Sequence, residues 1–284
     1  MSNSRHDRNK IFSSDSGETG IQKRDILLDD FGWEIPVESV PIPSKGKIYP
    51  SESSLSGRER INIKAMTAKE EDILTSRALM SSGTVIDELI KACVTDSDVD
   101  VSDMLSGDRT ALMVAIRITG YGPDYKLRAT CPGCGKSDQY TFNLADMPLK
   151  RLDIDPISPG SNRFEYKLPV SKKTVHFKFL TGRDNDLIDE EANNMSRLFP
   201  EDYIGSTVTR RLKFSVISID GIEDKNKTFK FIENMPAMDS KSLRTYIKKY
   251  EPGIDMVGKL NCKSCAKRSE VSLPIGASFF WPNI

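Results

Sequence analysis

Histidine, the side chain most often used for proton transfer in enzymes, is nearly absent: the 284-residue chain has only His6 and His176. His6 lies in a polar N-terminal stretch, and His176 alternates with Val175 and Phe177, which is typical of a surface-facing strand residue. A Ser/His/Asp set or a catalytic zinc held by imidazoles therefore has no basis in this sequence. We expect no catalytic residues, no organic cofactor and no enzymatic activity.

The sequence also lacks long apolar runs, a secretion signal and an excess of charge of one sign. Its longest apolar stretches fall far short of the roughly 20 residues that a membrane-spanning helix needs, so no stable membrane insertion is expected. The N-terminus has no apolar segment of about 7 to 15 residues, which predicts a protein that stays in a cytosol. Forty-one Lys and Arg balance forty-one Asp and Glu. Nucleic-acid-binding proteins usually carry a basic surplus, so nucleic acid is the less favoured partner.

Cysteine is uncommon, but four of the five cysteines form two Cys-x-x-Cys pairs. Zinc takes four thiolates in a tetrahedron, and two residues between paired cysteines let one tight turn offer both sulfurs to the same ion. The sequence therefore predicts one structural Zn²⁺ held by Cys131, Cys134, Cys262 and Cys265. A redox dithiol and unoccupied thiols are the alternatives. The redox motif belongs at a helix start after a strand, whereas both pairs here lie between strand-like segments.

The residues around the two pairs favour tight turns. Gly135 is free to take a positive φ after the first pair, whereas the second pair lacks glycine. Lys263 and Lys267 beside the second pair could offset the charge of four thiolates on a divalent ion. Cys93 is left over, and it lies on the apolar stripe of an amphipathic helix, which predicts a small buried residue.

Composition divides the first part of the chain into an arm and a strap. Residues 1–24 have too few apolar side chains to offset the entropy of ordering them, so we expect a disordered or partner-bound arm. Residues 25–66 are expected to form an extended strap and a short strand around Ile61 and Ile63, since the strap prolines forbid helix. The strap either lies on its own domain or is an extended ligand for a neighbouring subunit.

Residues 67–123 are expected to form a helical subdomain. Thr67 and Glu70 have the spacing of a capping box, which predicts a helix from there to Gly83. Apolar periodicity predicts two more helices, over 84–93 and 109–118.

Residues 124–284 are expected to form an α+β domain with an insertion. Two zinc-knuckle hairpins, 124–148 and 254–284, flank an inserted region, 149–253. The insertion is expected to contain a hairpin over 164–180, a charged helix over 183–197 and a helix over 240–249 capped by Asp239. Residues 203–217 fit helix or strand, and helix is favoured because Gly221 gives a stop. The predicted fold class is α+β, a helical subdomain plus antiparallel hairpins joined by a split four-cysteine zinc-ribbon-like site.

Two further clusters invite a functional interpretation. The acidic run Asp184, Asp186, Asp189, Glu190 and Glu191 lacks the spacing of a calcium loop and is better explained as a solvated helix face. The terminal Phe279-Phe280-Trp281-Pro282 is either core closure beside the second hairpin or an anchor in a partner's pocket, and core closure is favoured.

Taken in order, several segments resemble those of one family, the T-even-like contractile bacteriophage baseplate hub and hub-assembly proteins. The matching segments span about 40–284, and they are 43–49 (PSKGKIY), 66–74 (MTAKEEDIL), 107–109 (GDR), 117–122, the two cysteine pairs and 279–282 (FFWP).

The resemblance implies a non-enzymatic part in building a baseplate. It implies either a subunit retained in the virion or an assembly factor that leaves, with other phage baseplate and tail proteins as partners. The expected locations are the host cytoplasm during assembly and the tail baseplate of the virion. The alternative is a zinc-ribbon nucleic-acid-binding module, which a basic face around Lys259, Lys263, Lys267 and Arg268 would favour.

Overall fold

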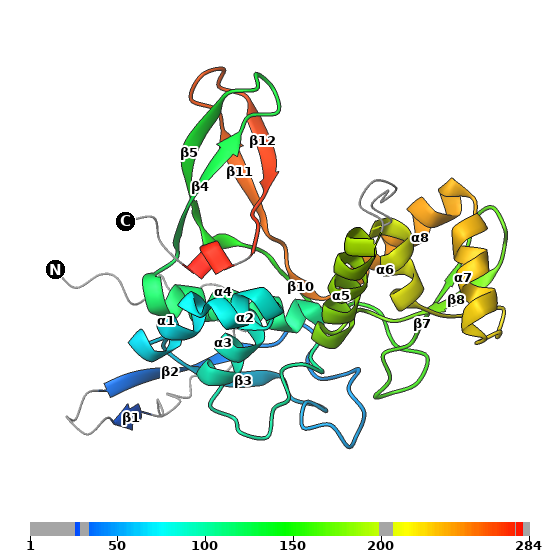
Figure 1. The fold of residues 1–284 in the computed structure, drawn as a ribbon, viewed down its shortest axis with the longest axis horizontal. Helices are drawn as coiled ribbons and strands as arrows, with labels where there is room; N and C mark the ends of the chain where they lie inside the picture. The colour runs from blue at the N-terminus through cyan, green and yellow to red at the C-terminus, as the bar shows by residue number, and fades with distance from the viewer. Residues whose placement is uncertain (1–25, 29–33, 199–206, 276, 281–284) are drawn as a thin grey trace.

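The computed structural model describes residues 26–28, 34–198, 207–275 and 277–280. The expected N-terminal arm, 1–24, lies outside the described residues, as do Trp281 and Pro282. Helices and antiparallel strand pairs both contribute, so the fold is α+β, as predicted. Figure 1 shows a helical body, a second group of helices and strands beside it, and a pair of hairpins that projects from the body.

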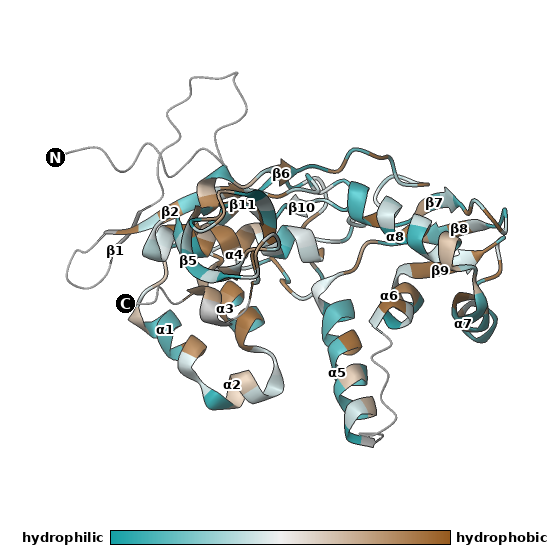
Figure 2. Ribbon diagram, turned by 90° about the horizontal axis from the view of Figure 1, so that it is seen from above, coloured by the Kyte–Doolittle hydropathy of each residue, from teal (hydrophilic) through white to brown (hydrophobic). Residues whose placement is uncertain are grey.

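The body is built around one buried helix, α4. Its elements are β1 (Ile26–Leu28), β2 (Glu34–Pro41), β3 (Arg60–Lys64), α1 (Ala68–Thr75), α2 (Arg77–Ser82), α3 (Val85–Cys93) and α4 (Ser106–Tyr121). The buried apolar side chains of α4 are Ala111, Leu112, Val114, Ala115, Ile116 and Ile118. They point to most sides of the helix, which is typical of a central helix covered by its neighbours. Figure 2 shows this helix largely brown within the body.

The first predicted helix is in fact two helices. Ser76 is extended (φ −65°, ψ 110°) and separates α1 from α2, and its hydroxyl accepts a hydrogen bond from the Leu79 amide (3.4 Å). Gly83 ends α2 in the left-handed region, at φ 77°. At the start of α1, the Glu70 carboxylate accepts from the Thr67 amide at 2.9 Å, which is the backward half of the expected capping box. Cys93, at the end of α3, is fully buried as predicted.

The strap packs on its own chain. Val40, Ile42, Ile48 and Tyr49 are all buried in the core that α3 and α4 share. The strap is extended only as far as Pro41, where β2 ends, and then runs through a series of turns. The expectation of an extended path is therefore wrong beyond Pro41. The alternative role as a ligand for a neighbouring subunit loses support, because the apolar side chains it would use are already buried.

The second group surrounds a small antiparallel sheet in the order β7-β8-β9. Its elements are β7 (Phe164–Lys167), β8 (Thr174–Phe177), α5 (Gly182–Leu198), α6 (Thr207–Ser215), β9 (Val216–Ile219), α7 (Lys225–Asn234) and α8 (Ala237–Tyr250). The predicted hairpin and the helix over 183–197 are present. The ambiguous segment contains both structures, since α6 passes directly into β9. Helix α7 was not predicted, although Asp224 caps it by accepting from the Lys227 amide at 2.8 Å.

Asp239 does not cap α8, which begins two residues earlier, after Pro236. Its buried carboxylate instead accepts hydrogen bonds from the backbone amides of Val170 (2.7 Å) and Ser171 (2.9 Å). The side chain thus joins α8 to the turn between β7 and β8. The prediction failed because the Asp239 carboxylate found donors in another part of the chain rather than at its own helix end.

The projecting hairpins are β4 (Asp124–Thr130) with β5 (Ser137–Asn143), and β11 (Val257–Asn261) with β12 (Arg268–Ser272). The pairing of β6 (Leu149–Lys150) with β10 (Gly253–Ile254) brings together the two ends of the long segment between the hairpins. At the base of the hairpins, Phe279 and Phe280 are fully buried, and the Arg117 guanidinium donates to the Phe279 carbonyl at 3.0 Å. These two rings close the core, as expected. Figure 1 shows the short red helix that carries them at the base of the hairpins.

Candidate metal centre

The two hairpins pack face to face through their inner side chains. Ala129, Cys131, Leu260 and Cys262 form a small buried cluster of their own near the tip. Closer to the body, a Cβ on Gly258 would overlap the ring of Phe142, so the absence of a side chain lets β11 approach β5. The two hairpins thus form a narrow, two-layered projection, the hairpin arm, which ends in the two cysteine turns.

Both cysteine turns have the same backbone hydrogen bonds. The Cys131 amide donates to the Lys136 carbonyl, and the Gly135 amide donates to the Cys131 carbonyl, each at 2.9 Å. The second turn repeats this pattern with Cys262, Lys267 and Ala266 at 3.0 and 2.9 Å. Gly135 has the expected positive φ, 72°, and Ala266 takes the same left-handed region at φ 55° despite its side chain.

All four paired cysteine sulfurs come together at the tip of the arm. Every pair of these sulfurs lies within 4.8 Å, with Cys131 to Cys265 at 3.8 Å and Cys134 to Cys262 at 3.6 Å. A disulfide would need about 2.05 Å. Four sulfurs placed about 2.3 Å from one ion at tetrahedral angles lie roughly 3.8 Å apart, so the two measured distances fit that arrangement.

The chemistry of the four donors fits zinc. Thiolates are soft ligands, and a closed set of four suits a zinc ion held for structure, with no coordination position left for water. Such an ion would cross-link the two hairpins when bound. Among the described residues, no other group of three or more His, Cys, Asp or Glu side chains is gathered closely enough to hold a metal.

The thiols differ in how readily they ionise. Backbone amides, first of Cys265 and then of Ser264, lower the pKa of Cys262 to about 6 because they donate to its thiolate. A backbone hydrogen bond from Lys267 lowers the pKa of Cys265, but the neighbouring thiols, Cys262 first among them, and burial together raise it to about 11. Burial raises the pKa of Cys93 to about 12, which keeps this core residue a thiol.

The two lysines of the second turn reach the first hairpin. The Lys263 ammonium donates to the Gln139 carbonyl (2.9 Å) and pairs with Asp138 (3.2 Å). The stem of Lys267 crosses the first turn so closely that a Cβ on Gly133 would overlap it. Gly133 therefore leaves room for this lysine stem, a role that the sequence alone did not reveal.

Two other sequence-based interpretations need correction. His176 is half-buried rather than surface-facing, and its Nδ1 lies 2.9 Å from the Ser218 hydroxyl and 3.0 Å from the Arg163 guanidinium. In the acidic run, Asp186, Asp189, Glu190 and Glu191 are exposed as predicted. Asp184 is buried and pairs with Lys178 at 2.7 Å.

Two of the segments that carry the family resemblance meet at one buried carboxylate. Asp108 accepts from the Ser44 amide (2.9 Å), the Ser44 hydroxyl (2.5 Å) and the Tyr49 hydroxyl (2.6 Å). The Tyr49 oxygen in turn accepts from the Leu105 amide at 2.8 Å. The motifs at 43–49 and 107–109 therefore form one hydrogen-bonded network that fixes the strap against α4.

The comparison with known families agrees with these features. The profile of the T4 bacteriophage base plate protein family matches residues 41–281, which is most of the chain. The chain belongs to this family. No curated protein and no solved structure gives a significant match. In the part of the chain that the structure describes, we find no helix with the length and apolar character to cross a membrane.

Proposed function

We propose that this chain is a non-enzymatic baseplate component or assembly factor that acts by protein–protein contacts and carries a structural zinc ion. The observation that carries the proposal is the four-cysteine cluster, which joins two distant hairpins in a chain of a phage baseplate family. A closed thiolate site suits the stiffening of a projecting arm rather than chemistry on a substrate.

The finer parts of the proposal concern place and partners. The chain occupies the hub of the baseplate. Its partners are other baseplate and tail proteins, and it acts on no small-molecule substrate. It meets them in the host cytoplasm during assembly. Within the chain we propose the division 1–24, 25–66, 67–123 and 124–284, with 149–253 inserted between the hairpins. The pairing of β6 with β10 supports that insertion, because it joins the two ends of the segment.

The test is mass spectrometry of purified virions and of baseplate assembly intermediates from infected cells. A retained subunit will be found in both, and an assembly factor only in the intermediates. The proposal fails if neither contains the chain and baseplates still form when its gene is removed. Deleting the N-terminal arm, residues 1–24, should leave the protein folded but reduce its incorporation into baseplates. The reason is that a disordered N-terminal segment can wrap a large surface of a partner.

One observation favours the nucleic-acid-binding alternative: Lys259, Lys263, Lys267 and Arg268 are all exposed on or beside the second hairpin. A gel-shift assay with duplex and single-stranded DNA at moderate salt separates the two functions. A shift that weakens steeply as salt rises would favour nucleic acid.

A further inference from the structure

The hairpin arm, here residues 125–143 and 257–272, is strongly basic although the whole chain has no net charge. It contains seven Lys or Arg and two Asp or Glu, a net charge of +5. The seven basic side chains are all exposed, and they are Lys126, Arg128, Lys136, Lys259, Lys263, Lys267 and Arg268. Only Lys263 forms an ion pair with a described residue, Asp138. The arm therefore presents a concentrated positive charge that its own chain does not neutralise.

Strand alternation places these charges on the outer surfaces of the arm. Lys126 and Arg128 lie on the face of β4 that points away from the second hairpin, since the alternate residues Tyr125 and Ala129 are buried. Lys259 and Arg268 lie on the outer face of the second hairpin, opposite Glu270 and Asn261 respectively. The remaining three lie within or directly after the cysteine turns at the tip. Both outer faces and the tip are thus basic.

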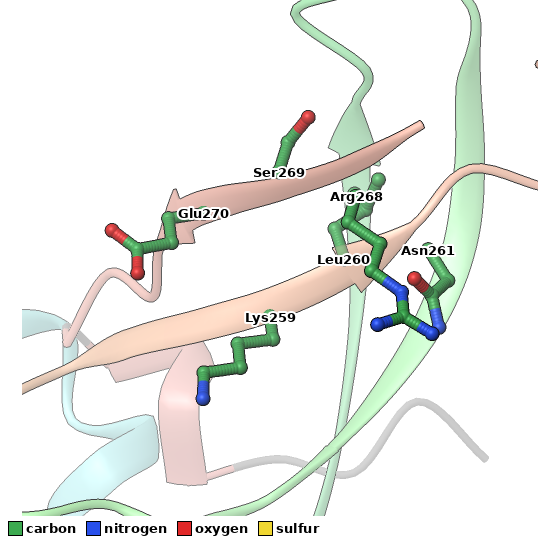
Figure 3. Close-up of a pocket in the computed structure, with 6 residues that line it drawn as sticks. All are labelled: Lys259, Leu260, Asn261, Arg268, Ser269 and Glu270. Carbon is green, nitrogen blue, oxygen red and sulfur yellow. The ribbon is translucent and has the colours of Figure 1, made fainter. Parts of the chain in front are cut away.

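The outer face of the second hairpin is also hollowed. A shallow pocket of about 430 Å³ is lined by Lys259, Leu260, Asn261, Arg268, Ser269 and Glu270. Figure 3 shows the Lys259 and Arg268 side chains extending from the strands, with Asn261 beside the guanidinium. An ammonium, a guanidinium and an amide are groups that bind carboxylates, and the arginine fork can do so with two hydrogen bonds.

The surroundings favour a protein carboxylate over a nucleic acid. Bound single strands are usually stacked on exposed aromatic rings, and the arm has three aromatic side chains. Its Tyr125 and Phe142 rings are buried, and Tyr140 is half-covered beneath Lys263. The partners implied by the baseplate family are proteins.

Resting on the proposed function, we infer that the hairpin arm is a docking element that inserts into an acidic surface of a neighbouring baseplate protein. Lys259 and Arg268 bind Asp or Glu side chains of that partner in the hollow. Charge on both faces fits a cleft that encloses the arm, and the stiffness of a metal-locked tip reduces the entropy lost on docking.

The experiment uses the full-length protein, supplied to infected cells whose phage lacks the gene. The test variant is Lys259→Gln with Arg268→Gln, and the matched control is Lys241→Gln with Arg244→Gln on the exposed side of α8. Unchanged metal content and thermal unfolding would establish that both variants fold. Zero-length carbodiimide cross-linking of isolated baseplates, read by mass spectrometry, then identifies carboxylates in direct contact with lysines.

We expect amide cross-links from Lys259 or Lys267 to Asp or Glu of another baseplate protein. Incorporation of the test variant should fall by about tenfold or more while the control is incorporated normally. Normal incorporation of the test variant, or cross-links that never involve the arm, would overturn the inference and leave the proposed function intact. The purified protein could instead bind duplex DNA more tightly than poly-L-glutamate, with DNA binding lost in the test variant and kept in the control. That result would assign the hairpin arm to nucleic-acid binding and overturn the inference. A chain that associates with no baseplate protein would overturn both.

Discussion

At the residue scale, the strap is held by a carboxylate that has no contact with water. Asp108 is fully buried, and that burial raises the pKa of its carboxyl even though Ser44 and Tyr49 donate to it. Burial, followed by the charge of Asp108, raises the pKa of the Tyr49 hydroxyl well above its ordinary value. Tyr49 therefore remains a hydrogen-bond donor to Asp108 well above neutral pH.

Replacing Asp108 with Ala should lower the free energy of unfolding by about 3 kcal/mol, because buried donors on Ser44 and Tyr49 would lose their acceptor. Urea denaturation of the two proteins measures the difference. The control is Asp103→Ala, which removes only an exposed pair with Arg183 and should cost less than about 1 kcal/mol. Equal losses in the two variants would contradict the network's role.

The two cysteine turns allow a matched test of backbone strain. Gly135 has no atom within 4 Å of an added Cβ, so Gly135→Ala adds only the strain of a positive φ and should destabilise by about 0.5 to 1 kcal/mol after the lower unfolded-state entropy of alanine is subtracted. Ala266→Gly should relieve the same strain and stabilise by about 0.5 to 1 kcal/mol after the greater unfolded-state entropy of glycine is subtracted. Thermal unfolding of the metal-loaded proteins would reveal the two effects. Shifts of the same sign would show that the turns are not equivalent.

At the element scale, α4 passes β10 at a point where each backbone has a glycine, Gly107 in α4 and Gly253 in β10. A Cβ on Gly107 would overlap the Pro252 carbonyl, and Gly253 lies against Gly107. Gly107→Ala should therefore cost more than about 2 kcal/mol, since neither backbone can move freely within the core. The control, Gly120→Ala on the same helix, meets only Met66 at 3.4 Å and should be neutral or slightly stabilising. A similar stability for the two variants in denaturant titrations would refute this close packing.

The contact between α8 and the β7–β8 turn should depend on pH. Burial raises the pKa of Asp239, but hydrogen bonds from Val170 and Ser171 outweigh it and leave the pKa below the ordinary value of 3.8. The stabilisation is therefore complete above about pH 4 and is lost as pH falls through the folded pKa. Asp239→Asn should be less stable than the natural protein at pH 7, with the difference shrinking below pH 4. A difference that stays constant down to pH 3 would exclude the carboxylate as its source.

Elements with strong local signals were predictable from the sequence, whereas those decided by distant contacts were not. The strands beside the cysteines and the buried stripe of α3 follow directly from alternation and helical spacing. The break at Ser76 and the change from α6 to β9 could not be read from periodicity. In β9, pairing with β8 overrides a pattern that also fits a helix. Asp239 was misassigned for the same reason, because its hydrogen-bond donors come from a hairpin nearly 70 residues away.

At the scale of the whole molecule, the candidate metal centre connects parts of the chain that are far apart in sequence. The cysteine pairing was predictable because Cys-x-x-Cys spacing reflects the geometry of the ion itself. The basic side chains of the second hairpin were also visible in the sequence. The projection of the arm, and the joining of this charge with that of the first hairpin, were not, because they emerge only when hairpins more than 100 residues apart pack together. An ion bound there would stabilise the folded state by its binding free energy, because the unfolded chain does not hold the four sulfurs together.

The most direct test of this account is the metal content of the folded protein, measured by native mass spectrometry beside elemental analysis. The natural protein should carry one zinc ion per chain, and Cys134→Ser should lose it and unfold at a markedly lower temperature. Cys93→Ala, which removes the core thiol, should retain the ion. A natural protein that is fully folded without metal, or a Cys134→Ser variant that binds as much zinc as the natural protein, would contradict the account.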